Sequence, residues 1–172
     1  MGIVERMAVP MRPRLERREL RDVALGQFVL LTESANQGTS TLSLGLRTQT
    51  PVEGQDPVDG LIHLESGKFE WLAPKSLLTV VDSCELVPDI SKATIRNPRS
   101  GDLILYAAAP QIYVTELHNG AHGVFDLKTG VAVGHHVLGA HVVMQWSVID
   151  VLERTIFRFE PDTGGAWAFG SL

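Results

Sequence analysis

The chain has 172 residues, of which 44% are hydrophobic and 20% are charged. This is the length of one domain, and it is long enough to bury a substantial core. The formal net charge of −5 gives no overall reason to bind nucleic acid. Six of the 15 Lys and Arg residues precede residue 22, so the rest of the chain is distinctly acidic. This asymmetry indicates an N-terminal segment with a partner of its own.

Cysteine content and hydropathy bear on the compartment. Cys84 is the single cysteine, so no internal disulfide can form. Arg6, Pro10 and Pro13 interrupt the N-terminus too early for the apolar core of a signal peptide. No stretch approaches the roughly 18 consecutive apolar residues of a membrane-spanning helix. We therefore expect a protein made in the cytoplasm, with neither a signal peptide nor a transmembrane segment.

Residues 1–19 are predicted to form an N-terminal arm, because Pro10 and Pro13 prevent a helix from crossing them. Five arginines in or just after this arm are candidates for a partner-binding or phosphate-binding surface: Arg12, Arg14, Arg17, Arg18 and Arg21. They could neutralise phosphates of nucleic acid or of lipid headgroups. Interleaved carboxylates such as Glu16 and Glu19 weaken the positive field, so an acidic surface of a neighbouring copy is an equally good partner.

Residues 20–172 are predicted to form a single β domain. About ten short strands follow one another at a spacing of roughly 8 to 12 residues, with turn residues between them and no long helix. Residues 48–60 contain two prolines and two glycines, which predicts a surface loop long enough to contact a partner. Pro110 is expected to separate a strand over 102–109 from a strand over 112–117. This pattern is typical of an all-β sandwich or barrel.

The longest apolar stretch of the chain is residues 142–160. Alternate positions are apolar, as in Val142, Met144 and Trp146, and this period of two is typical of half-buried strands. A helix is the competing interpretation, because other apolar residues of the stretch lie about one helical turn apart. Val, Ile, Thr and Phe outnumber the good helix formers, so we favour two strands with a bend near residues 150–154.

A group of histidines is the feature that most resembles a metal site. Five of the six histidines lie between residues 118 and 141, and neutral imidazoles bind transition metals. Four of them are candidate ligands: His118, His122, His135 and His141. No carboxylate stands at a diagnostic spacing, and no HExxH motif is present. We therefore expect neither a metal nor another cofactor, and interpret these histidines as residues of turns and strand ends.

A second candidate chemistry involves Cys84. The order of Cys84, the segment Gly101-Asp102-Leu103-Ile104 and then His122 resembles the layout of the NlpC/P60-type peptidases. The resemblance implies a cysteine nucleophile at the start of a helix, with the histidine as its base. The residues that follow Cys84 are not the small residues of that family, and the interval to Gly101 is shorter than its helices require.

In size, strand count and N-terminal arm, the chain resembles the single jelly-roll capsid proteins of viruses and phages, although no motif carries the resemblance. It implies a jelly-roll-like sandwich or barrel whose arm runs to a neighbouring copy, a genome or a membrane. On this basis we expect a non-enzymatic structural subunit of a virion that associates with copies of itself through loops, strand edges and the arm. A second structural protein is a further partner, and no small-molecule substrate is expected.

Two other functional classes stay open. One is a metal- or cysteine-dependent hydrolase that uses the His118–His141 cluster together with Cys84. The other is a small binding or immunity module. No motif in the chain specifies a chemistry, so the sequence alone does not decide among the three.

Overall fold

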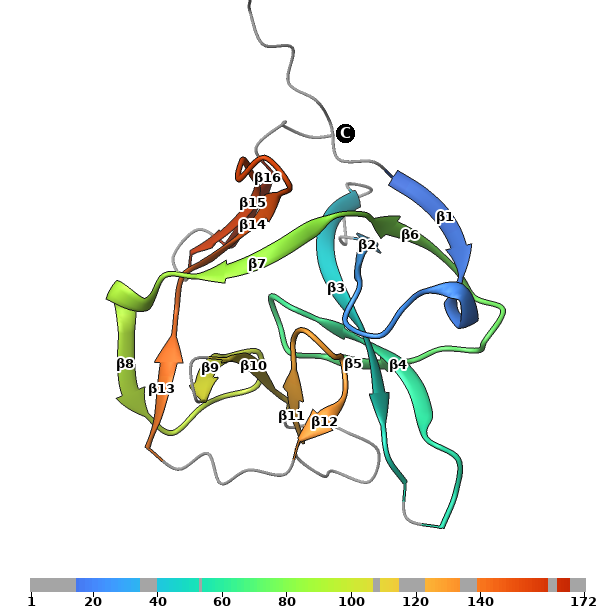
Figure 1. Ribbon diagram of the computed structural model, residues 1–172, viewed down its shortest axis with the longest axis horizontal. Helices are drawn as coiled ribbons and strands as arrows, with labels where there is room; N and C mark the ends of the chain where they lie inside the picture. The colour runs from blue at the N-terminus through green and yellow to red at the C-terminus, as the bar shows by residue number, and fades with distance from the viewer. Residues whose placement is uncertain are drawn as a thin grey trace, which may run out of the picture.

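The computed structural model describes residues 15–34, 40–52, 54–106, 109–114, 123–133, 139–160 and 164–167 (Figure 1). Most of these residues lie in β-strands or in the turns that connect them. Within these ranges there is no α-helix, and the helical segments are two single 3-10 turns, η1 (Leu20–Asp22) and η2 (Ile90–Lys92). The prediction of an all-β domain is therefore confirmed.

The first sheet has six strands, and each neighbouring pair is antiparallel. Their spatial order is β1 (Leu15–Glu19), β6 (Leu77–Val81), β2 (Phe28–Ser34), β3 (Ser40–Thr50), β4 (Val58–His63) and β5 (Phe69–Trp71). The strand β1 consists of the last five residues of the predicted arm, which pair with β6 from Leu15 opposite Val81 to Glu19 opposite Leu77. Residues 1–14 of that arm lie outside the described residues.

The second sheet also has six described strands and is antiparallel throughout. Their order is β12 (Ala132–Val133), β11 (Gly123–Asp126), β10 (Ala109–Val114), β9 (Leu103–Tyr106), β13 (Ala140–Val143) and β8 (Ala93–Arg96). The strand β8 therefore forms one edge of this sheet, and it lies at the margin of the molecule (Figure 1).

The third sheet has four described strands in the order β16 (Gly164–Trp167), β15 (Thr155–Glu160), β14 (Trp146–Asp150) and β7 (Cys84–Pro88). The chain passes from β6 in the first sheet to β7 in the third through Asp82 and Ser83. Ser83 has a φ of 56°, a left-handed conformation that redirects the chain at this corner. The amide of Gln27 donates to the carboxylate of Asp82 at 2.8 Å and ties the corner to the first sheet.

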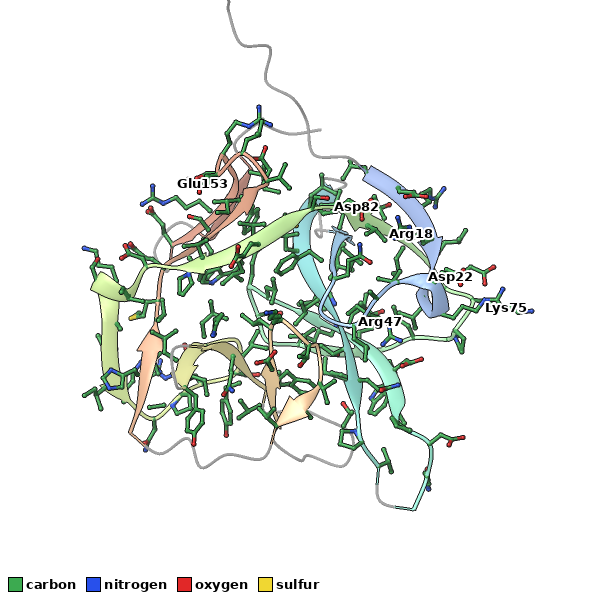
Figure 2. All side chains as sticks on the ribbon, in the orientation of Figure 1. Arg18, Asp22, Arg47, Lys75, Asp82 and Glu153 are labelled. Carbon is green, nitrogen blue, oxygen red and sulfur yellow. The ribbon has the colours of Figure 1, made fainter. Side chains whose placement is uncertain are left out.

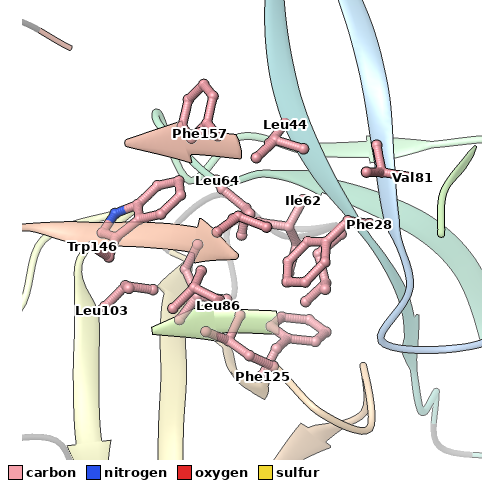
Figure 3. Packing of buried hydrophobic residues seen from close by; sticks show 14 of the residues in the cluster. Phe28, Leu44, Ile62, Leu64, Val81, Leu86, Leu103, Phe125, Trp146 and Phe157 are labelled. Carbon is pink, nitrogen blue, oxygen red and sulfur yellow. The ribbon is translucent and has the colours of Figure 1, made fainter. Parts of the chain in front are cut away.

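Side chains from all three sheets meet in one core, as in a β-sandwich (Figure 3). Phe28 and Ile62 come from the first sheet, Phe125 from the second, and Trp146 and Phe157 from the third. The rings of Trp146 and Phe157 lie 5.5 Å apart between centroids. Burial of each such side chain contributes about 1.5–3 kcal/mol to folding. None of the three sheets closes into a barrel among the described strands.

Smaller apolar clusters lie apart from this core. One contains Val29, Leu78 and Val80, and it is completed by Leu20 from η1. These side chains alternate with the core-facing residues of the same strands, so they occupy the other face of the first sheet. Another cluster contains Ile104, Val124 and Val142 on the second sheet. The first and second sheets therefore bury apolar side chains on both faces.

The predicted bend within residues 142–160 is confirmed, because β14 and β15 form an antiparallel hairpin that turns at residues 151–154. The start of this stretch differs from the prediction. Val142 and Val143 belong to β13 of the second sheet, and the chain leaves that sheet at Met144. The alternation is interrupted there because the residues before Met144 pair in the second sheet and those after it pair in the third.

Two predictions about loops were wrong. The loop expected at residues 48–60 is shorter, because Thr48 pairs with Gly60 and the ladder between β3 and β4 continues to Thr50. Pro110 does not separate two strands but lies within β10, opposite Leu105 of β9. A proline is tolerated there because it lies near the beginning of the strand, before the ladder with β11 begins at Gln111.

Candidate functional site

The five candidate arginines of the N-terminal region fall into two groups. Arg12 and Arg14 lie outside the described residues. Arg17 and Arg18 lie on β1, and Arg21 lies in η1. The structure thus places Arg17 and Arg18 on an edge strand of the first sheet and Arg21 in the 3-10 turn that follows it. Whether they bind phosphate or protein stays a prediction.

Two of the described arginines are paired with carboxylates of the same chain. The guanidinium of Arg18 lies 2.6 Å from Glu16 and 3.4 Å from Asp82, and Figure 2 shows Arg18 and Asp82 beside each other. The hydrogen bond to Glu16 raises the pKa of Arg18. Arg21 lies 2.7 Å from Glu19. The exposed Arg17 has no ion pair with another described residue, so among the three described arginines of this region it is the one most available to a partner.

The histidine candidates are only partly placed. His118, His122 and His135 lie outside the described residues. His141 lies on β13 with its side chain exposed, and its Cα partner on the edge strand β8 is Ile95. Among the residues that the structure describes, no group of three or more His, Cys, Asp or Glu side chains is placed to hold a metal ion. The histidine-cluster hypothesis therefore stays a prediction.

Sequence reasoning did not single out His63, which is buried on β4. Its Nε2 lies 3.1 Å from a carboxylate oxygen of Glu70, across the hairpin that connects β4 to β5. The pairing was visible in the sequence only as two polar residues on either side of a glycine turn. A buried imidazole beside one carboxylate is an ordinary way to satisfy a polar side chain in a sheet.

Cys84 is the first residue of a strand, β7, and not the first residue of a helix as in the family its surroundings resemble. Its thiol lies 3.5 Å from the carbonyl oxygen of Val81. Burial raises the pKa of the Cys84 thiol to about 12, and the negative charge of Asp82 adds to the shift. A thiol with this pKa is almost wholly protonated at neutral pH, and the thiolate is the form that attacks a substrate. The histidine partner expected for it, His122, lies outside the described residues.

Cys84 also lines a pocket of about 460 Å³ between β7, the start of β2 and the turn after β11. Apolar side chains form most of its wall: Phe28, Leu86, Pro110 and Leu127. Glu85 and Lys128, both exposed, bring one negative and one positive charge to it. The pocket therefore combines an apolar interior with charge at its rim, a combination suited to binding an amphipathic group.

Exposed apolar side chains lie on edge strands of all three sheets. Leu15 lies on β1 and Trp71 on β5, the two edges of the first sheet. Val87 lies on β7, an edge of the third sheet, and Ile95 lies on β8, an edge of the second. Natural sheets usually protect their edges with charged residues or proline, since an edge strand can pair with another chain. Apolar residues at these positions are therefore the most informative surface feature of the described chain.

Among these sheet edges, exposure is greatest along β8 and the adjoining η2. Ile90 is 69% exposed and Ile95 is 68% exposed, although both belong to regular structure. The side chain of Asp89 caps η2 by accepting hydrogen bonds from the hydroxyl and the backbone N–H of Ser91, which lower the pKa of Asp89. The two isoleucines are thus exposed to solvent on an ordered sheet edge.

The other end of β8 is also fixed. The guanidinium of Arg96 binds both carboxylate oxygens of Asp102, at 2.6 and 2.8 Å. This two-pronged geometry is the strongest form of an arginine–carboxylate pair. We define η2 and β8, residues 90–96, as the η2–β8 edge. Its ends are anchored by polar contacts while Ile90 and Ile95 face solvent.

No helix among the described residues is both long enough and apolar enough to cross a membrane. No protein-family model, curated protein or solved structure matches the chain.

Proposed function

We propose that this protein is a non-enzymatic structural subunit that associates with copies of itself through exposed strand edges, with its loops and N-terminal arm as further contacts. The observation that carries the proposal is the presence of exposed apolar side chains on edge strands of all three sheets. The assembly we propose is a capsid-type shell of a virus or phage, built from jelly-roll-like subunits.

The η2–β8 edge is the strongest contact candidate in this proposal. Pairing with a second copy would satisfy the open backbone groups of β8 and remove Ile90 and Ile95 from water. Burying one such side chain contributes about 1.5–3 kcal/mol, and each 1.4 kcal/mol changes a dissociation constant about tenfold. Burial of the two isoleucines would therefore lower the dissociation constant of self-association about tenfold or more.

The experiment is size-exclusion chromatography with light scattering over a series of protein concentrations. Wild-type protein is expected to form oligomers whose mass exceeds that of one chain. Ile95→Lys is expected to weaken association by about tenfold or more, because it places an unpaired charge in the contact. Thr94→Lys is the matched control, since Thr94 is exposed on the same strand but on its opposite face.

Each outcome of this experiment leads to a different conclusion about self-association. A wild-type chain that stays monomeric at every concentration at which it is soluble would remove the proposal. An oligomer that responds equally to both lysine variants would show that strand pairing, and not the apolar face of β8, carries the contact. Electron microscopy of the wild-type oligomer then tests the capsid-type assembly, which requires closed particles of uniform size.

The N-terminal arm supplies a second contact in this proposal. Arg17 is exposed and unpaired among the described residues, whereas Arg18 and Arg21 are bound by carboxylates of their own chain. A neighbouring copy, a second structural protein, nucleic acid and anionic headgroups are the candidate partners. Binding to phosphate would weaken steeply as salt concentration rises, and it would respond to replacement of Arg17.

A further inference from the structure

The turn between β14 and β15 displays two apolar side chains at its tip. Val151 is 75% exposed and Leu152 is 62% exposed, which places them among the most exposed large apolar residues of the described chain. Glu153, the next residue, has a φ of 58° and is also exposed (Figure 2). We call residues 151–153 the hairpin tip.

The carboxylate of Asp150 fixes the backbone of the hairpin tip through hydrogen bonds. The carboxylate of Asp150 accepts hydrogen bonds from the backbone N–H of Leu152 at 2.9 Å and of Arg154 at 3.0 Å. The guanidinium of Arg154 donates to the same carboxylate at 2.5 and 2.9 Å. A backbone turn that is already ordered loses little conformational entropy on binding, so this tip is suited to insertion into a partner.

The pocket beside Cys84 is equally well fixed. Gly26 has a φ of 77°, and its backbone N–H donates to the carbonyl of Arg47 at 2.8 Å. A Cβ atom at Gly26 would lie 2.2 Å from the carbonyl oxygen of Lys128, so the chain segments on this side of the pocket touch through their backbones. The pocket is therefore a preformed feature of the fold, and its volume of about 460 Å³ exceeds what two aliphatic side chains occupy.

Tip and pocket are complementary in two respects. The tip offers Val151 and Leu152 to a pocket whose wall is mostly apolar. Glu153 on the tip and Lys128 at the pocket carry opposite charges, and neither side chain has an ion pair with another described residue. The pocket also carries Glu85, so the charges favour a position of Glu153 next to Lys128 and away from Glu85. Complementary charges at the rim of an apolar contact favour one docking orientation over others.

The two features also lie near each other on one molecule, since Asp150 at the base of the tip is the Cα partner of Cys84 in the pocket wall. The exposure of Val151 and Leu152 shows that the tip does not fill the pocket of its own chain. A twofold axis close to this end of the third sheet would place each tip at the pocket of the other copy. Such a contact is reciprocal and closed, as in most homodimers.

We propose that a second copy of this chain is the occupant of the pocket, with the hairpin tip of each copy inserted into the pocket of the other and Glu153 paired with the partner copy's Lys128. The inference rests on the proposed function, because it requires self-association. It names a contact separate from the η2–β8 edge.

A charge exchange between Glu153 and Lys128 tests the contact by sedimentation velocity of the full chain. Glu153→Lys and Lys128→Glu are each expected to weaken association about three- to tenfold, since each places two like charges together. The double variant restores the attraction and should bind within about twofold of wild type. Lys75→Glu is the matched control, because Lys75 is exposed and lies far from Glu153 in Figure 2.

Leu152→Asp provides a second readout that does not depend on the ion pair. Leu152 is exposed in the single chain, so its replacement leaves folding intact, while its loss from an apolar pocket should weaken association about tenfold or more. Retained association of Leu152→Asp, or a double charge variant no better than the single variants, would overturn the inference while the proposed self-association stands. A wild-type chain that is monomeric throughout would overturn both.

Discussion

The β14–β15 hairpin contains two regions of similar composition and opposite environment. At its base, Trp146 is 2% exposed and Phe157 is fully buried in the core. At its tip, Val151 and Leu152 face water. Hydrophobicity alone does not distinguish these regions, because both are apolar stretches of the same strand pair. The two regions differ because neighbouring sheets cover the base of the hairpin and leave its tip exposed. Apolar residues that no sheet covers are candidates for contact with another molecule.

The largest expected effect comes from comparing the base of the hairpin with its tip directly. Phe157→Ala is expected to lower the free energy of unfolding by about 3–5 kcal/mol, since it leaves a cavity among packed side chains. Leu152→Ala should change it by less than about 0.5 kcal/mol in the monomer. Denaturant unfolding of both variants at low protein concentration measures the difference. Similar losses in the two variants would mean that the tip is part of the folded core.

Buried and exposed ion pairs offer the same comparison for polar groups. The guanidinium of Arg47 is buried and lies 2.7 Å from Asp59, whereas Arg18 pairs with Glu16 at the surface. Asp59→Asn leaves a buried cation without its counter-charge and is expected to cost about 1–3 kcal/mol of unfolding free energy. Glu16→Gln should cost at most about 1 kcal/mol. Denaturant titrations of both variants give the comparison, and equal costs would contradict it.

The smallest effect concerns the pH dependence of the hairpin tip. The hydrogen bond from the Arg154 side chain is the main cause that lowers the pKa of Asp150 below its ordinary value, near 3.9. Because the pKa of Asp150 is lower in the folded state, the ionised carboxylate stabilises the turn at pH values above the ordinary pKa. The stabilisation is lost as pH falls through the lower folded-state pKa.

Asp150→Asn should therefore lower stability slightly at neutral pH, and the difference from wild type should shrink as the solution is acidified below about pH 4. Thermal unfolding of both proteins between acidic and neutral pH measures this trend. A difference that grows on acidification would contradict the role of the Asp150 carboxylate.

The sequence predicted the fold class and much of the strand content, because strand residues reveal themselves by local pattern. The β14–β15 hairpin follows from the β-branched and aromatic residues that flank residues 150–154. The same pattern misplaced Val142, because alternation cannot show where the chain leaves one sheet for another. Pro110 predicts a strand boundary from sequence alone, because its place within a ladder depends on the pairing of strands and not on local pattern.

The candidate site was less accessible from sequence, for a related reason. Ile90 and Ile95 lie among polar residues in a segment without a distinctive pattern, and only the order of strands shows that β8 is an edge. The pocket joins Phe28, Leu86 and Leu127, which are far apart in the chain, so no local spacing reveals it. The composition reveals the arginines near the N-terminus, but only the three-dimensional structure shows which of them pair with carboxylates.

We infer that the exposed apolar edges and the hairpin tip are contact surfaces between copies of this chain. Amide hydrogen exchange of the wild-type protein at low and high concentration tests it most directly, because it reports burial segment by segment. We predict slower exchange at high concentration in β8 and around residues 151–154, with no change in the already buried β14. Exchange that is independent of concentration in both surface segments would contradict the claim.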